Sequence, residues 1–193
     1  MTDTKNISRS YAMPRLDMKL KTVASLIGII SAVLLPQIVH MVGKITETGS
    51  HLGEMLLPMQ LPVLIVGLFA GPVAGLTTGI LAPIISYTLT GMPGNAILPF
   101  MILELATYGL ISGLVREFKT NTFFKVFLAQ FAGRGIRAIA ILVAFYVVGS
   151  DKIAPAVIWT SIKVGFVGIL VQLIVIPFLI YIVRKADEDG ITG

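Results

Sequence analysis

The stretch QFAGRGIRAIAIL, residues 130–142, places two arginines in the middle of an apolar run that extends from residue 123 to residue 148. A membrane-spanning helix needs about 20 predominantly apolar residues, so this run is long enough to cross a bilayer. Each arginine near the centre of such a helix costs roughly 2.5 to 3.5 kcal/mol on insertion scales. Arg134 and Arg137 therefore predict a polar site inside a membrane-embedded helix bundle.

The composition extends this prediction to the whole chain. Of its 193 residues, 55% are hydrophobic and 13% are charged, whereas soluble domains carry about 25% charged residues. The mean hydropathy is +0.91, so we expect an integral membrane protein made of one bundle in the lipid bilayer. Further apolar runs lie at residues 22–42, 55–70, 72–90, 97–115 and 155–183. With the run at 123–148 they predict an all-α membrane protein with six transmembrane helices.

The distribution of lysine and arginine predicts the orientation. Residues 1–21 hold five of them, the connection after the fourth run holds three, and the tail at 184–193 holds two. The opposite side holds only Lys44 and Lys152. Since cytoplasmic loops are enriched in Lys and Arg, both termini are predicted to be cytoplasmic. Residues 22–183 then form the transmembrane domain between a basic N-terminal segment, 1–21, and a cytoplasmic tail, 184–193.

Prolines and glycines interrupt the second of these runs. Pro58 and Pro62 each remove a backbone donor, and the Gly71-Pro72 turn separates the second run from the third. This hairpin is predicted to be short, bent or partly broken. The glycines at 67, 71, 75 and 79 recur every four residues, which favours close packing inside the chain's own bundle.

Several chemistries are disfavoured by residues that the sequence lacks. It has no cysteine and two histidines, too few for a metal centre, and we predict neither a metal nor a cofactor. There is no GxxxxGK[ST] phosphate loop, no HExxH and no GxSxG. The net charge of +5 reflects the basic N-terminal segment and predicts topology, with no nucleic-acid partner. Catalysis is therefore disfavoured relative to binding and translocation.

The charged residues inside the predicted spans are Glu104, Arg134, Arg137 and Lys163. Glu104 lies seven residues from the external end of its run, Lys163 eight and Arg137 eleven, which corresponds to depths of about 10 to 17 Å. They could converge on one outward-facing cavity. Three cations against one carboxylate leave an excess of two positive charges, which favours a negatively charged or acceptor-rich ligand.

Alternatives remain for each of these residues. Arg134, and with less reason Arg137, could extend its long side chain to the cytoplasmic interface. Lys163 could instead be a structural partner of Glu104. Further polar candidates for the mouth of the cavity are Gln60, His51 and Asn95, although amphipathic side chains also collect at membrane boundaries for other reasons.

A stripe of small residues marks the first predicted helix. Ala24, Gly28 and Ala32 are four residues apart, so they lie on one helix face and permit close approach of another helix. That neighbour could belong to the chain's own bundle. Because the stripe lies near the basic N-terminus, it could also be the interface with a partner protein.

Four stretches carry a resemblance to a known family. They are LGEMLLPMQLPVLIVGLFAGPVAGLTTGILAPIISYTLTGMPGN at 52–95, LPFMILELATYGLISGL at 98–114, AGRGI at 132–136 and GFVGILVQLIVIPFLI at 165–180. Their order, the six apolar runs and the length together resemble the substrate-specific S components of energy-coupling factor (ECF) vitamin transporters. The resemblance covers nearly the whole chain.

The resemblance implies a six-helix bundle in a prokaryotic plasma membrane that holds one vitamin or precursor near its external face. It implies a transmembrane coupling protein and two cytoplasmic ATPases as partners. In that family an alanine-x-x-x-alanine pattern on the first helix contacts the coupling protein, and Ala24-x-x-x-Gly28-x-x-x-Ala32 fits with glycine in the middle. The TGMPGN-to-ELATYG arrangement looks most like S components assigned to cobalamin or to pantothenate.

Two rival functions are kept open. The chain could be a stand-alone, gradient-driven secondary transporter that uses Glu104 as a proton carrier. It could also be a small intramembrane enzyme that modifies lipids.

Overall fold

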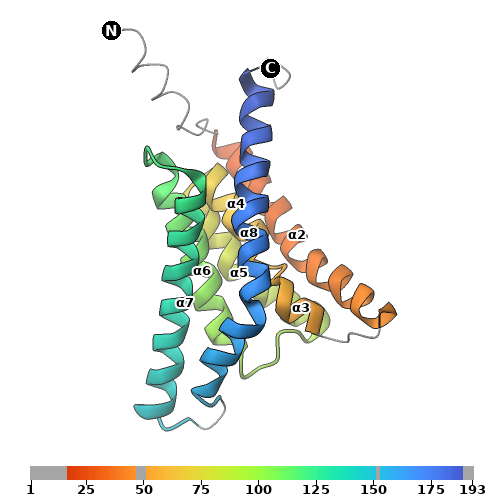
Figure 1. The fold of residues 1–193 in the computed structure, drawn as a ribbon, viewed down its shortest axis with the longest axis vertical. Helices are drawn as coiled ribbons and strands as arrows, with labels where there is room; N and C mark the ends of the chain where they lie inside the picture. Colours follow the sequence, from red (N-terminus) through yellow and green to blue (C-terminus); the bar gives the residue numbers. More distant parts are fainter. Residues whose placement is uncertain (1–16, 47–50, 151–152, 189–193) are drawn as a thin grey trace.

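The computed structural model describes residues 17–46, 51–150 and 153–188, and within these residues the ordered elements are all helical (Figure 1). A short 3-10 helix, η1 (Val115–Glu117), follows the fourth long helix. The α-helices are α2 (Met18–Ile45), α3 (His51–Leu56), α4 (Gln60–Ala70), α5 (Pro72–Thr90), α6 (Leu98–Leu114), α7 (Thr122–Tyr146) and α8 (Ala156–Glu188). The all-α prediction is confirmed for this part of the chain.

Five of these helices are long and apolar enough to cross a membrane: α2, α5, α6, α7 and α8. The expected break in the second apolar run is confirmed, and the count of six spans stays a prediction because this run does not form one helix of membrane length. It is divided into the six-residue α3 and the eleven-residue α4, and α4 is only about 16 Å long against a hydrocarbon core of about 30 Å.

The break between α3 and α4 covers Leu57, Pro58 and Met59. Leu57 has a φ of 50°, a conformation that L-residues rarely adopt and that ends α3. Pro58 follows directly and cannot donate a backbone hydrogen bond. The backbone N–H of Gln60 then donates to the carbonyl of Leu57 at 3.1 Å, which starts α4.

Glycines let α5 and α6 pack with their backbones in contact. A Cβ atom at Gly75 would overlap the carbonyl oxygen of Gly109, and one at Gly79 would overlap that of Leu105. Gly71, with φ of 97°, forms the turn between α4 and α5. The four-residue glycine series thus serves packing within the bundle, as predicted.

The small-residue stripe of α2 is covered by the chain itself. Ala32 is fully buried in the main hydrophobic cluster, and Ala24 packs against a second cluster that includes Val66. A Cβ atom at Gly28 would overlap the side chain of Val66. The stripe therefore faces α4 and α5, which corrects the expectation that Ala24, Gly28 and Ala32 present a surface to a partner protein.

The first residues of α2, the η1 turn and the last residues of α8 lie at one end of the bundle, the upper end in Figure 1. We call this the basic end, because Lys19, Lys21, Arg116 and Lys185 belong to these elements. Arg116 Nη1 donates to the carbonyl of Phe69 at 3.0 Å. The common location of these basic segments agrees with the charge pattern, and their cytoplasmic location stays a prediction.

Candidate functional site

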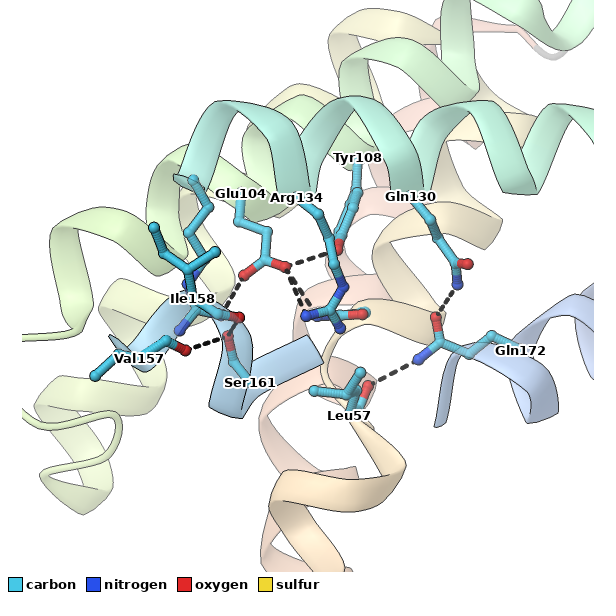
Figure 2. Close-up of polar contacts among 11 residues, drawn as sticks. Leu57, Glu104, Tyr108, Gln130, Arg134, Val157, Ile158, Ser161 and Gln172 are labelled. Carbon is cyan, nitrogen blue, oxygen red and sulfur yellow. Dashed lines mark hydrogen bonds and ion pairs between the residues drawn. The ribbon is translucent and has the colours of Figure 1, made fainter. Parts of the chain in front are cut away.

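Glu104 on α6 is the centre of a buried polar cluster (Figure 2). Its side chain is 1% exposed, and Arg137 Nη1 lies 2.8 Å from Oε2. Oε1 accepts a hydrogen bond from the Tyr108 hydroxyl at 2.7 Å and one from Gln60 Nε2 at 3.4 Å. Tyr108 follows Glu104 by four residues, so one face of α6 supplies both groups. Helices α4, α6 and α7 thus converge on one carboxylate.

Arg134 is the second cation of this cluster. Its Nη1 atom lies 3.9 Å from Glu104 Oε1, and its side chain is 13% exposed. Because Arg134 and Arg137 are three residues apart on α7, they lie on the same helix face. The structure directs both guanidinium groups to Glu104 and not to the basic end of the bundle. The alternative in which they reach the cytoplasmic interface is therefore wrong for this structure.

The formal charge of the cluster is positive. Two guanidinium groups share one carboxylate, so one positive charge is left without an anion among the described residues of the cluster. The polar atoms Arg134 Nε, Arg134 Nη2 and Arg137 Nε are also buried without a hydrogen-bond partner in the described part of the chain. Native proteins rarely leave buried donors unpaired, so these atoms suggest a ligand or water that completes the site.

A cavity of about 370 Å³ borders the cluster on the side away from the basic end. Its wall comes from α2, the α3–α4 break, α5, the segment between α5 and α6, and α6, α7 and α8. Its volume is in the range of small-molecule sites. The polar side chains that line it are Gln37, His40, Gln60, Ser86, Arg137, Thr160 and Ser161. Glu104 and Arg134 lie behind this lining.

Two amide atoms in the cavity wall have no hydrogen-bond partner within the described residues. They are Nε2 of Gln37 on α2 and Oε1 of Gln60 on α4. Gln60 is 3% exposed and belongs to the cavity lining. Sequence reasoning missed Gln37, His40 and Ser161. A polar amide in the otherwise apolar stretch of α2 was the signal that could have indicated Gln37.

A second buried polar network holds the α3–α4 break in place. Gln172 on α8 donates from Nε2 to the carbonyl of Leu57 at 3.1 Å and accepts from Gln130 Nε2 on α7 at 2.8 Å (Figure 2). A Cβ atom at Gly168 would lie 2.5 Å from the carbonyl oxygen of Met55. A glycine contact and a glutamine side chain thus fix the segment that carries Leu57 and Gln60 into the cavity wall.

The remaining predicted site residues are not brought to this cluster. Lys163 is exposed on α8 and does not line the cavity, because it points away from the face of α8 that carries Gln172. It therefore neither pairs with Glu104 nor adds the third cation that we expected. Asn95 is exposed in the segment between α5 and α6, whose residues Met92 and Pro93 do line the cavity. The side chain of His51 lies outside the described residues.

A larger hollow of about 830 Å³ lies at the basic end, between the start of α2, the Gly71 turn and η1. It is lined by Lys21, Arg116 and Glu117 among others. The cluster of Glu104 and Arg137 does not border it. The buried, incompletely paired polar atoms of the cluster therefore assign the candidate site to the smaller cavity.

Comparison with known proteins identifies the family. No curated protein and no solved structure gives a significant match to the chain. Residues 19–180 match the family model described as ECF transporter, substrate-specific component. This match includes α2 to α7 and most of α8, and it agrees with a multi-pass transport protein with several membrane-length helices. The chain therefore belongs to the ECF transporter substrate-specific component family.

Proposed function

We propose that this chain is the substrate-binding subunit of an ECF-type importer and that it captures a vitamin or related micronutrient in the 370 Å³ cavity. One observation carries the proposal: in a member of this family, the partly buried Arg137 lines a ligand-sized cavity and has a buried Nε atom without a hydrogen-bond partner among the described residues. Arginine is well suited to bind an acidic micronutrient because its planar group donates two parallel hydrogen bonds to a carboxylate.

The size of the cavity supports one of the two cargo types that the sequence suggested. Pantothenate is small and has one carboxylate, which Arg137 could bind. Cobalamin is several times larger than a cavity of about 370 Å³, so it would require a wide opening of the bundle. We therefore propose a compact cargo of the size of pantothenate.

The energy for uptake would come from partner proteins. The chain contains no phosphate-binding loop of its own, and we propose that a transmembrane coupling protein and two cytoplasmic ATPases supply ATP hydrolysis. The basic end would face the cytoplasm of a prokaryotic cell and the cavity would open on the external side. Because the α2 stripe is covered by α4 and α5, the coupling protein would contact other residues.

Two measurements test this function. Mass spectrometry of the small molecule retained by the detergent-purified chain should identify an acidic micronutrient of vitamin size. In proteoliposomes the chain alone should bind that compound without accumulating it, and accumulation should require the coupling protein, the ATPases and ATP.

The rival functions give different results in the same assays. Accumulation by the chain alone that collapses with a protonophore would instead support a gradient-driven transporter with Glu104 as its proton carrier. Turnover of a lipid by the purified chain would support the enzyme.

A further inference from the structure

The arrangement of Glu104 between two arginines also has consequences for how cargo binds. We propose that Glu104 is a resting counter-ion of Arg137, that an anionic group of the cargo displaces it, and that Glu104 then pairs with Arg134. The cargo would accordingly be a compact monoanion. This inference rests on the proposed function, since it assumes that a small molecule enters the 370 Å³ cavity.

Arg137 can be reached from the cavity, whereas its present partner cannot. Arg137 belongs to the cavity lining and Glu104 does not. The guanidinium group has five N–H donors, and the bond from Nη1 to Glu104 Oε2 uses one of them. Nε is buried and unpaired within the described residues. An incoming carboxylate can therefore meet the same guanidinium that now neutralises Glu104.

Arg134 is placed to take over the released carboxylate. Its Nη1 lies 3.9 Å from Glu104 Oε1, about an ångström beyond a charge-assisted hydrogen bond. Nε and Nη2 have no partner in the described part of the chain, so nothing described there holds the guanidinium away from Glu104. On the neighbouring α8, Gly165 has no side chain where a Cβ atom would lie 3.1 Å from Arg134 Nη2. Arg134 is therefore the nearest cation that could pair with Glu104 among the described residues once Arg137 binds another anion.

Two neutral groups would keep Glu104 in position during this exchange. The Tyr108 hydroxyl and Gln60 Nε2 both donate to Oε1, and Arg137 contacts Oε2. Loss of Arg137 therefore leaves the carboxylate anchored through its other oxygen. The exchange requires rotation of the two arginine side chains and no movement of α6.

The charge balance indicates how many charges the cargo has. Two arginines and one glutamate leave a charge of +1 in the cluster. A monoanion makes the complex neutral, a dianion would leave −1, and a neutral compound would leave the cation uncompensated. Because unpaired charge is costly in a buried site, the monoanion is favoured.

The test compares matched acidic and neutral compounds on the same variants. Calorimetric titration of the detergent-purified chain would use pantothenate with pantothenol, nicotinate with nicotinamide, and biotin with biotinamide. We expect one carboxylate to bind and its neutral counterpart to bind at least tenfold more weakly. Glu104→Gln removes the competitor for Arg137, so the bound carboxylate should bind about tenfold more tightly.

Arg134→Gln distinguishes the exchange from direct contact. Arg134 does not line the cavity, yet its loss should weaken binding of the carboxylate about tenfold and leave any binding of the neutral counterpart unchanged. In the Glu104→Gln background, Arg134→Gln should weaken binding of the carboxylate compound by a smaller factor. Position 104 then has no carboxylate that needs Arg134 as its partner.

Weaker binding of the carboxylate to Glu104→Gln would overturn the exchange, because it would make Glu104 a direct ligand; the proposed function would still stand. Binding of neutral compounds only would overturn the monoanion claim. Binding of no compound would overturn it too and would also count against the proposed function.

If Glu104→Gln does not fold, Glu104→Asp is the second variant, because its shorter side chain keeps the negative charge but places it farther from Arg137. It should then tighten binding by a smaller factor, and equal or weaker binding would overturn the exchange.

Discussion

Substitution of Gln172 by leucine should destabilise the protein more than substitution of its partner Gln130. Gln172 is 1% exposed and makes two side-chain hydrogen bonds, one to Gln130 and one to the Leu57 carbonyl. Interhelical hydrogen bonds in membranes contribute about 0.6 kcal/mol on average and at most about 1.7 kcal/mol. The lost bonds alone should therefore cost about 1 to 2 kcal/mol.

The unpaired amide left behind adds to this cost. Gln130 Oε1 is already without a partner among the described residues, so Gln172→Leu leaves the whole Gln130 amide unpaired, at a cost of about 1 kcal/mol or more. Gln130→Leu loses one bond and leaves Gln172 Oε1 unpaired, but it removes its own unpaired oxygen and keeps the bond from Gln172 to Leu57. We expect losses of about 2 to 3 kcal/mol for Gln172→Leu and about 1 kcal/mol for Gln130→Leu. The double variant should lose less than the sum, since it leaves no amide behind.

The assay is thermal unfolding in one detergent, with the wild type, both single variants and the double variant measured together. A loss of about 2 to 3 kcal/mol corresponds to a decrease in Tm of very roughly 4 to 12 °C for a chain of this length. Val171→Leu, at an exposed position on the same helix, is the control and should change Tm little. Equal effects of the two single variants, or strictly additive effects in the double variant, would refute this account of the network.

Three further predictions concern packing and charge. Gly109→Ala should destabilise the fold by more than about 2 kcal/mol, because its Cβ atom would overlap the carbonyl of Gly75. Gly135→Ala is the control, since a Cβ atom at Gly135 would meet open space, and it should leave Tm unchanged or slightly higher. Thermal unfolding measures both variants. Arg137→Gln should weaken binding of an acidic cargo at least about tenfold, or about 1.4 kcal/mol, and unchanged affinity in calorimetry would remove Arg137 from the site. Lys163→Gln, at an exposed position, should retain wild-type affinity, and a tenfold loss would return Lys163 to the site.

The sequence predicted the class of the fold well because membrane proteins obey strong constraints. A continuous apolar run of about 20 residues is helical in lipid, because a helix satisfies its backbone hydrogen bonds within its own segment. The same constraint made charged residues inside the runs conspicuous, and the structure brings Glu104 together with Arg134 and Arg137. Their role in binding stays a prediction.

The face that each residue occupies could not be predicted in the same way. In a membrane protein both the lipid and the core are apolar, so hydrophobic periodicity does not distinguish the inner from the outer face of a helix. This is why Lys163 was expected at the site although it is exposed, and why the Gly28 stripe was assigned to a partner although it faces α4 and α5. The precise break at Leu57 also depends on the tertiary contact with Gln172.

The truncated α4 explains how a polar molecule could be held at membrane depth. A helix of full length in this place would fill its column of the bundle with its own side chains. Because α4 begins only at Gln60, residues of α3, of the break and of the neighbouring helices line a cavity at its start. The membrane crossing between α2 and α5 is thus divided between α3 and α4, and the residues around Pro58, where it is divided, line the wall of the cavity.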